Sequence, residues 1–127
     1  MAELDRIVVL GSSLTALAIV RAAKALCIHS IILDTRRGIA FDSRHPTPIH
    51  CPEGNDDFLL QQLEGVASKD SGALIADSDG WLRFIVRCRP ALESMFASVL
   101  HPGSRSIELC LDKSLFLDWC MDNGFQA

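Results

Sequence analysis

The residues with the clearest chemistry lie in the first turn that follows a predicted strand. Gly11-Ser12-Ser13-Leu14-Thr15-Ala16 has the spacing of the G-x-G-x-x-G/A turn, in which glycines let a pyrophosphate approach the backbone at a helix N-terminus. The first glycine is present and the last position holds the permitted alanine, but Ser13 replaces the middle glycine. A serine side chain obstructs the approach of a pyrophosphate, so the dinucleotide motif is incomplete.

Three interpretations of this turn stay open. In the first, the turn binds a nicotinamide or flavin dinucleotide. In the second, the helix N-terminus and the two serine hydroxyls bind an anionic group of a substrate. In the third, Gly11 only makes a tight turn between strand and helix. Asp34 ends the next predicted strand, where an acid would bind a ribose, and an arginine-rich loop follows it. Ligands of open sheets gather beyond the carboxyl ends of strands, although a solvated loop is the alternative. The candidate substrate-binding residues are Gly11, Ser12, Ser13 and Asp34.

Other catalytic and metal sites find no support in the sequence. It contains neither a G-x-x-x-x-G-K-[ST] nor a G-x-S-x-G motif, which would indicate a P-loop and a serine nucleophile. His50 and Cys51 are adjacent, but no second pair has the spacing of zinc ligands. Asn55, Asp77 and Asp79 are interpreted as helix caps. We therefore predict no catalytic residue and no metal site within the chain.

Composition excludes further classes of function. The 127 residues carry a net charge of -4 and 49% are hydrophobic, and no segment concentrates Lys and Arg as a nucleic-acid surface would. Arg83, Arg87 and Arg89 are predicted to form a solvated helix edge. No apolar run approaches a membrane span, and the N-terminus is acidic. Five scattered cysteines are typical of a cytoplasmic protein with reduced, mostly buried thiols.

The elements that position the turn form a predicted β-α-β unit. Residues 6–10 are a continuous apolar strand closed by Gly11, residues 14–26 an amphipathic helix capped by Ser12 or Ser13, and residues 30–34 a second buried strand. Such a unit is parallel and right-handed. A third strand at 47–51 is assigned to a sheet edge because of Pro48.

Strands and helices continue to alternate to the end of the chain. A helix capped by Asn55 leads to a strand at 73–75, and the next helix ends at Pro90, with a second short helix after it. A strand at 99–100, a helix capped by Ser104, and a last helix capped by Asp112 and closed by Gly124 follow. This pattern predicts an α/β fold with an open, mostly parallel Rossmann-like sheet of about four to five strands and flanking helices.

Three segments together resemble the N-terminal, or pre-ATP-grasp, domain of the ATP-grasp superfamily, in its carboxylate-amine ligase type. The first is the strand-turn-helix of residues 7–13 with Ile31-Ile32-Leu33-Asp34, and the second is Phe41-Asp42-Ser43-Arg44. The third is the most distinctive, and it comprises Ile107-Glu108-Leu109-Cys110-Leu111-Asp112-Lys113, Phe116, Trp119-Cys120 and Asn123-Gly124. The resemblance covers essentially the whole chain.

The resemblance implies that the chain is divided into two regions with different roles. Residues 1–103 would be the Rossmann-like domain, and residues 104–127 a helical connection into an ATP-grasp domain that this piece lacks. Lys113 matches the basic residue that reaches nucleotide phosphates in relatives, while Gly11, Ser12 and Ser13 match a turn that borders the acceptor substrate. ATP and Mg²⁺ are the cofactors implied for the full-length protein, and no cofactor is expected on the fragment. The partners implied are the missing domain, a small-molecule carboxylate and an amine.

The function predicted from this resemblance is the substrate-side domain of an ATP-dependent carboxylate-amine ligase. In such enzymes ATP converts a carboxylate to an acyl phosphate, which an amine then captures. The alternative is a self-standing Rossmann-like module that binds a dinucleotide (NAD or FAD) or a regulatory ligand. An exposed sheet edge or the final helix could also pair two copies of the fragment into a homodimer.

Overall fold

The computed structural model describes residues 3–126. Its centre is a five-stranded sheet with the order β3-β2-β1-β4-β5, in which every neighbouring pair is parallel. The strands are β1 (Arg6–Leu10), β2 (His29–Asp34), β3 (Thr47–His50), β4 (Gly72–Ala76) and β5 (Ser98–Val99). The predicted α/β class and parallel sheet are confirmed, and the strand that contains Pro48 lies at an edge as expected.

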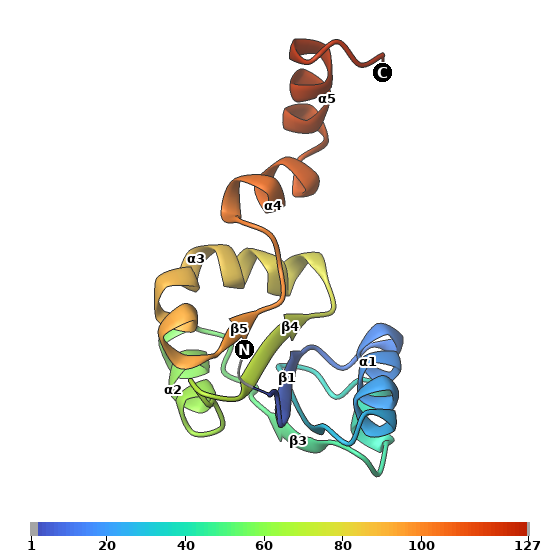
Figure 1. The fold of residues 1–127 in the computed structure, drawn as a ribbon, viewed down its shortest axis with the longest axis vertical. Coiled ribbons are helices and arrows are strands. Elements are labelled where there is room, and N and C mark those ends of the chain that lie inside the picture. The colour runs from blue at the N-terminus through green and yellow to red at the C-terminus, as the bar shows by residue number, and fades with distance from the viewer. Residues whose placement is uncertain (1–2, 127) are drawn as a thin grey trace.

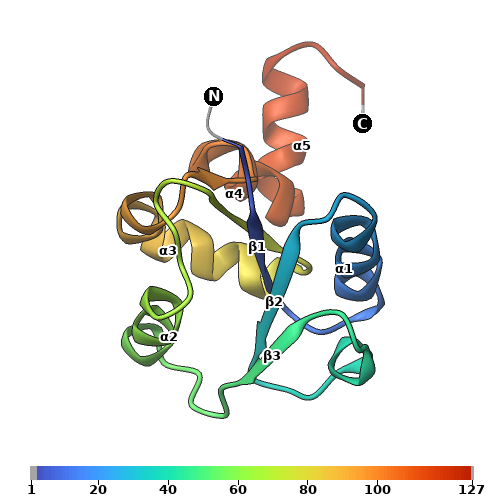
Figure 2. The same cartoon turned by 60° about the horizontal axis from the view of Figure 1, so that its bottom comes forward.

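Helices cover both faces of the sheet (Figure 2). On one face α1 (Leu14–Ala25) and the short 3-10 helix η1 (Ile39–Asp42) enclose a core that includes Val9 and Ile32. On the other, α2 (Asp56–Glu64) and α3 (Asp79–Met95) pack over a larger core that includes Leu10 and Phe84. Strands buried on both faces explain why β1 and β2 are continuous apolar runs without alternation.

Two further helices extend the chain beyond these layers. α4 (Ser104–Leu111) packs on α3, and α5 (Lys113–Asp122) follows it and stands away from the sheet (Figure 1). Ile107 is the buried anchor of α4, whereas no residue of α5 is buried. Within residues 3–126 no helix combines the length and the apolar character that crossing a membrane requires.

Most of the predicted caps are confirmed. Ser13 caps α1, Asn55 caps α2 through the amide of Phe58, and Asp112 caps α5 through the amides of Ser114 and Leu115. Gly124 has φ +78°, and the next amide bonds back to the Cys120 carbonyl at 2.8 Å. This left-handed glycine ends α5 in the way that the sequence indicates.

Pro90 does not end a helix, and here the prediction is wrong. α3 runs unbroken from Asp79 to Met95 with Pro90 inside it. Proline removes one backbone donor and favours a kink. However, Phe84, Cys88 and Leu92 recur every four residues and are all buried, so one continuous apolar stripe on both sides of the proline holds the helix together. Three smaller differences concern caps and a short helix. Gly103 and not Ser104 caps α4, Ser78 and not Asp77 or Asp79 is the N-cap of α3, and helix η1 was not predicted.

Two predictions about side-chain exposure also need correction. Only Cys51 and Cys88 are buried, where burial raises the pKa of each thiol, while Cys27 and Cys110 are exposed and Cys120 is half-buried. All five cysteines are free thiols, as predicted. The arginines of α3 are not simply solvated either, because Arg87 pairs with Asp56 and Arg89 binds two backbone carbonyls.

Candidate functional site

A cavity of about 520 Å³ opens at the carboxyl ends of the central strands. It lies between β1 and β4, where the strand order reverses. From β1 the chain continues to β2 and β3 on one side, and from β4 it continues to β5 on the other. In open α/β sheets this switch point is where ligands bind, because the loops after the two central strands diverge there. The lining residues are Ser12, Ser13, Asp34, Thr35, Arg36, Gly38, Gly54, Leu59, Asp77, Ser78, Gly80, Trp81, Phe84 and Arg87.

Ser12 ties three segments together on one wall of the cavity. Its side chain is buried, and its hydroxyl donates to the Asp34 carboxylate at 2.5 Å and accepts from the amide of Gly38 at 2.8 Å. The other carboxylate oxygen of Asp34 accepts from the amide of Thr35 at 2.8 Å. Because both groups are already hydrogen-bonded inside the protein, they form a rigid wall and offer only their remaining acceptor capacity to a ligand.

Ser13 faces a second carboxylate, that of Asp77. Its backbone amide donates to Oδ2 of Asp77 at 3.1 Å and its hydroxyl donates to the same oxygen at 2.5 Å. Gly11 has φ +118°, and a Cβ atom there would overlap the Asp77 carboxyl group. A glycine is therefore favoured at position 11 by the backbone conformation, and the Asp77 carboxyl group lies directly against it.

The opposite wall is aromatic and basic. Trp81 and Phe84 of α3 are packed edge to face, with ring centroids 5.6 Å apart. Arg87, one turn further along α3, makes a two-pronged ion pair with Asp56 of α2 at 2.9 and 3.0 Å. This pairing raises the pKa of Arg87 and holds the pKa of the Asp56 carboxyl below its usual range. Aromatic surface beside a few polar groups is typical of a small-molecule pocket.

Of the five predicted binding residues, three line the cavity, a fourth lies just behind its wall and the fifth lies outside it. Ser12, Ser13 and Asp34 line the cavity, and Gly11 lies behind the Asp77 carboxylate. Lys113 occupies the first turn of α5, as expected, but it is not among the residues that line the cavity. Sequence reasoning missed Asp77, Trp81 and Arg87 as parts of the site. Their position just after β4, at the switch point of the sheet, was the available signal.

Metal ligands are not gathered in this part of the protein. Among residues 3–126, no three side chains of His, Cys, Asp or Glu come close enough to hold a metal ion. The site thus consists of two carboxylates, two arginines and an aromatic pair, a set suited to binding and orienting an organic ligand.

Comparison with known proteins supports the fold that the resemblance implied. The sequence matches no protein-family model and no curated protein. Among solved structures, the chain is similar to N5-carboxyaminoimidazole ribonucleotide synthetase from Thermotoga maritima, with a TM-score of 0.66 and 15% sequence identity. The match covers 95% of this chain and 31% of that one, so the chain spans about a third of the synthetase. At this level of identity the likeness shows the fold alone, and this fold is that of one part of the synthetase.

Proposed function

We propose that this chain is the substrate-side domain of an ATP-dependent carboxylate-amine ligase, and that nucleotide binding and phosphoryl transfer reside in another part of the same protein. The observation that carries the proposal is the switch-point cavity in a domain whose fold is shared with such a ligase. The cavity would hold one of the two small molecules to be joined. ATP and Mg²⁺ would activate the carboxylate in the other domain, where magnesium stabilises the transferring phosphoryl group.

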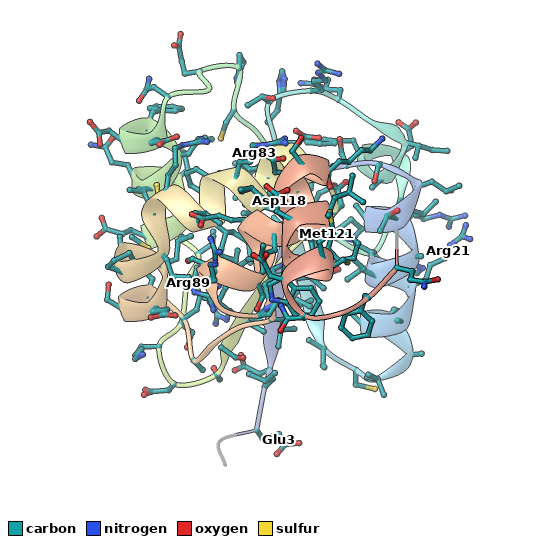
Figure 3. All side chains as sticks on the ribbon, turned by 90° about the horizontal axis from the view of Figure 1, so that it is seen from above. Glu3, Arg21, Arg83, Arg89, Asp118 and Met121 are labelled. Atoms are coloured by element: carbon teal, nitrogen blue, oxygen red, sulfur yellow. The ribbon has the colours of Figure 1, made fainter. Side chains whose placement is uncertain are left out.

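The surface of α5 supports the presence of a further domain. Large apolar side chains are exposed around this helix, with Met121 at 70% and Phe116 and Leu117 each at 45%. Figure 3 looks down onto α5 from above, with Asp118 and Met121 labelled on this helix. Exposed apolar side chains in such number normally mark a surface that another part of a protein covers. In the proposed enzyme, α4 and α5 lead into the ATP-grasp domain, and that domain covers them.

Ligand binding to the cavity is testable by fluorescence. The chain has two tryptophans, one in the cavity and one on α5, so the Trp119→Phe variant reports from Trp81 alone. We expect an aminoimidazole ribonucleotide, the class of compound in the name of the similar synthetase, or another amine substrate to change Trp81 emission saturably. The matched control is Trp81→Phe, in which Trp119 should not respond. If no amine or carboxylate in a broad panel alters Trp81 emission, the cavity is not the substrate site.

The nucleotide role of Lys113 needs the intact polypeptide encoded by the gene. With ATP and Mg²⁺, we expect Lys113→Ala to bind nucleotide about tenfold more weakly, the scale of one lost charge-assisted contact. Lys24→Ala, which removes an exposed lysine of α1, is the control. Equal affinities of the wild type and the Lys113 variant would remove this residue from the nucleotide site.

A self-standing dinucleotide module is the less favoured function. Ser13 stands where the motif needs a glycine, and its amide is already bonded to Asp77. Saturable binding of NADH or a flavin to the wild-type chain would favour this alternative over the ligase domain.

A further inference from the structure

The N-terminal end of α1 already holds an anion that belongs to the protein itself. Helix N-termini attract anions because their first amides are unpaired and the helix dipole is positive there. In dinucleotide-binding domains, the pyrophosphate takes this position next to the glycine turn. Here the Asp77 carboxylate accepts hydrogen bonds from the amide and the hydroxyl of Ser13, and it packs directly on Gly11.

We infer that Asp77 is a specificity-determining residue that occupies this anion position and excludes phosphates and dinucleotides from the glycine turn. A phosphate placed there would have to displace the carboxylate from Ser13 or share its contacts. It would also lie close to the carboxylate of Asp34, across the turn from Asp77. Like charges at such short range disfavour binding.

The backbone around Asp77 holds its carboxylate in place. Its amide donates to the Leu10 carbonyl at 3.0 Å, so the β1–β4 pairing continues one residue past β4 and sets the side chain over the turn. Asp77 does not cap its own helix, because Ser78 is the N-cap of α3. Its hydrogen bonds go to α1 instead, a helix that starts more than sixty residues earlier in the chain.

The positively charged side chains that line the cavity are those of Arg36 and Arg87. Arg36 comes from the loop after β2 and Arg87 from the third turn of α3. Arg87 is already paired with Asp56, so Arg36 is the cation that an acidic group of a ligand can pair with, whereas the carboxylate at the turn repels such a group. This inference concerns the turn alone and holds whether or not the chain is part of a ligase.

Removing the carboxylate should create the anion site that it now fills. We would titrate the wild-type chain, Asp77→Ala and Asp77→Asn with pyrophosphate and with NADH by calorimetry. Asp77→Ala should bind pyrophosphate at least about tenfold more tightly than the wild type, in line with a charge at a helix N-terminus. Asp77→Asn keeps the shape and should gain less, because its amide oxygen can still accept from Ser13.

Asp79→Asn is the matched control, because it removes one negative charge from an exposed position two residues away. An equal gain in Asp79→Asn and Asp77→Ala would reduce the effect to net charge and overturn the inference. A second measurement needs no variant. In wild-type protein the amide resonance of Ser13 should not move during a pyrophosphate titration, and a saturable shift of that resonance would also overturn the inference.

Discussion

The hydroxyl of Ser12 shows how one small side chain can organise a site. It is almost fully buried, and it joins the turn after β1 to the end of β2 and to the loop before η1. None of these partners is close to it in sequence, since Asp34 and Gly38 lie 22 and 26 residues away. The sequence indicates a helix cap at positions 12 and 13, but not this buried network.

Replacing Ser12 by alanine should cost about 1–3 kcal/mol of the free energy of unfolding, because the Gly38 amide loses its acceptor and Asp34 loses a donor. Urea denaturation monitored by circular dichroism measures the change. Ser106→Ala, at an exposed position of α4, should change stability by less than about 0.5 kcal/mol. Similar effects of the two substitutions would contradict the role given to the Ser12 network.

A substitution at Gly38 should also reduce stability, because the position has no room for a side chain and not because it needs a special backbone conformation. A Cβ atom at this position would overlap the backbone oxygen of Ser12. Gly38→Ala should therefore destabilise the protein by about 1–3 kcal/mol, the usual cost of overpacking. Gly65→Ala is the control, since Gly65 has right-handed helical backbone angles and a Cβ there makes only an ordinary contact, 3.5 Å from the Gln62 carbonyl oxygen. A neutral Gly38→Ala variant, by the same urea measurement, would show that the loop moves away at little cost.

Among the elements, α3 does the most to connect the parts of the molecule. Its first turns line the cavity, its middle supplies the buried stripe under the sheet, and Arg89 near its end reaches the segment that leads to α4. Local sequence rules favour a break at Pro90. The packing of residues from both halves of the helix against one core outweighs that preference, and only the folded structure shows this.

Arg89 should control how firmly α4 is held. Its guanidinium donates to the carbonyls of Pro102 at 2.7 Å and His101 at 3.1 Å, and it pairs with Glu93 at 2.8 Å. In Arg89→Ala we expect backbone amides of residues 101–111 to exchange with deuterium at least about tenfold faster, since hydrogen bonds from a charged group contribute about 1.5–3 kcal/mol.

Arg89→Lys should restore only part of this protection, because an ammonium cannot match the planar fork of the guanidinium. Arg21→Ala, on the distant helix α1, is the control for loss of an exposed arginine (Figure 3). Unchanged exchange in α4 of the Arg89→Ala variant would show that burial of Ile107 alone fixes this helix.

For the molecule as a whole, the sequence suffices to predict the layers of the fold but not the side-chain contacts within the site. Continuous apolar strands, caps and alternating elements suffice to predict a parallel α/β sheet, and the order of the strands then locates a cavity beyond Ser12, Ser13 and Asp34. The position of Asp77 just after β4 was a signal for the site, but its contact with Ser13 was not predictable, because the two residues meet across 64 residues of chain. Such a contact depends on how β1 and β4 pair in the folded sheet.

Another long-range contact, between His101 and the end of β4, predicts how the stability of the fold depends on pH. The Nε2 atom of His101 accepts from the amide of Ala76 at 2.8 Å, so a ring nitrogen replaces a backbone carbonyl just beyond the β4–β5 pairing. Burial, and then the nearby charge of Arg89, lower the pKa of His101 below its ordinary value of 6.5. The unfolded chain therefore binds a proton more readily than the folded protein, and stability falls as the pH drops below about 6.5.

Thermal unfolding between pH 8 and pH 5 checks this dependence. The wild type should keep a constant unfolding temperature above pH 7 and lose stability below about 6.5, with the loss complete once the pH is under the lowered pKa of His101. His101→Gln keeps an acceptor oxygen but does not titrate, so its profile should be flatter in this range. His45→Gln, in the exposed loop before β3, should retain the wild-type slope. An identical slope in the His101 and His45 variants would mean that other groups set the pH response, and that the neutral ring of His101 is not what holds the end of β4.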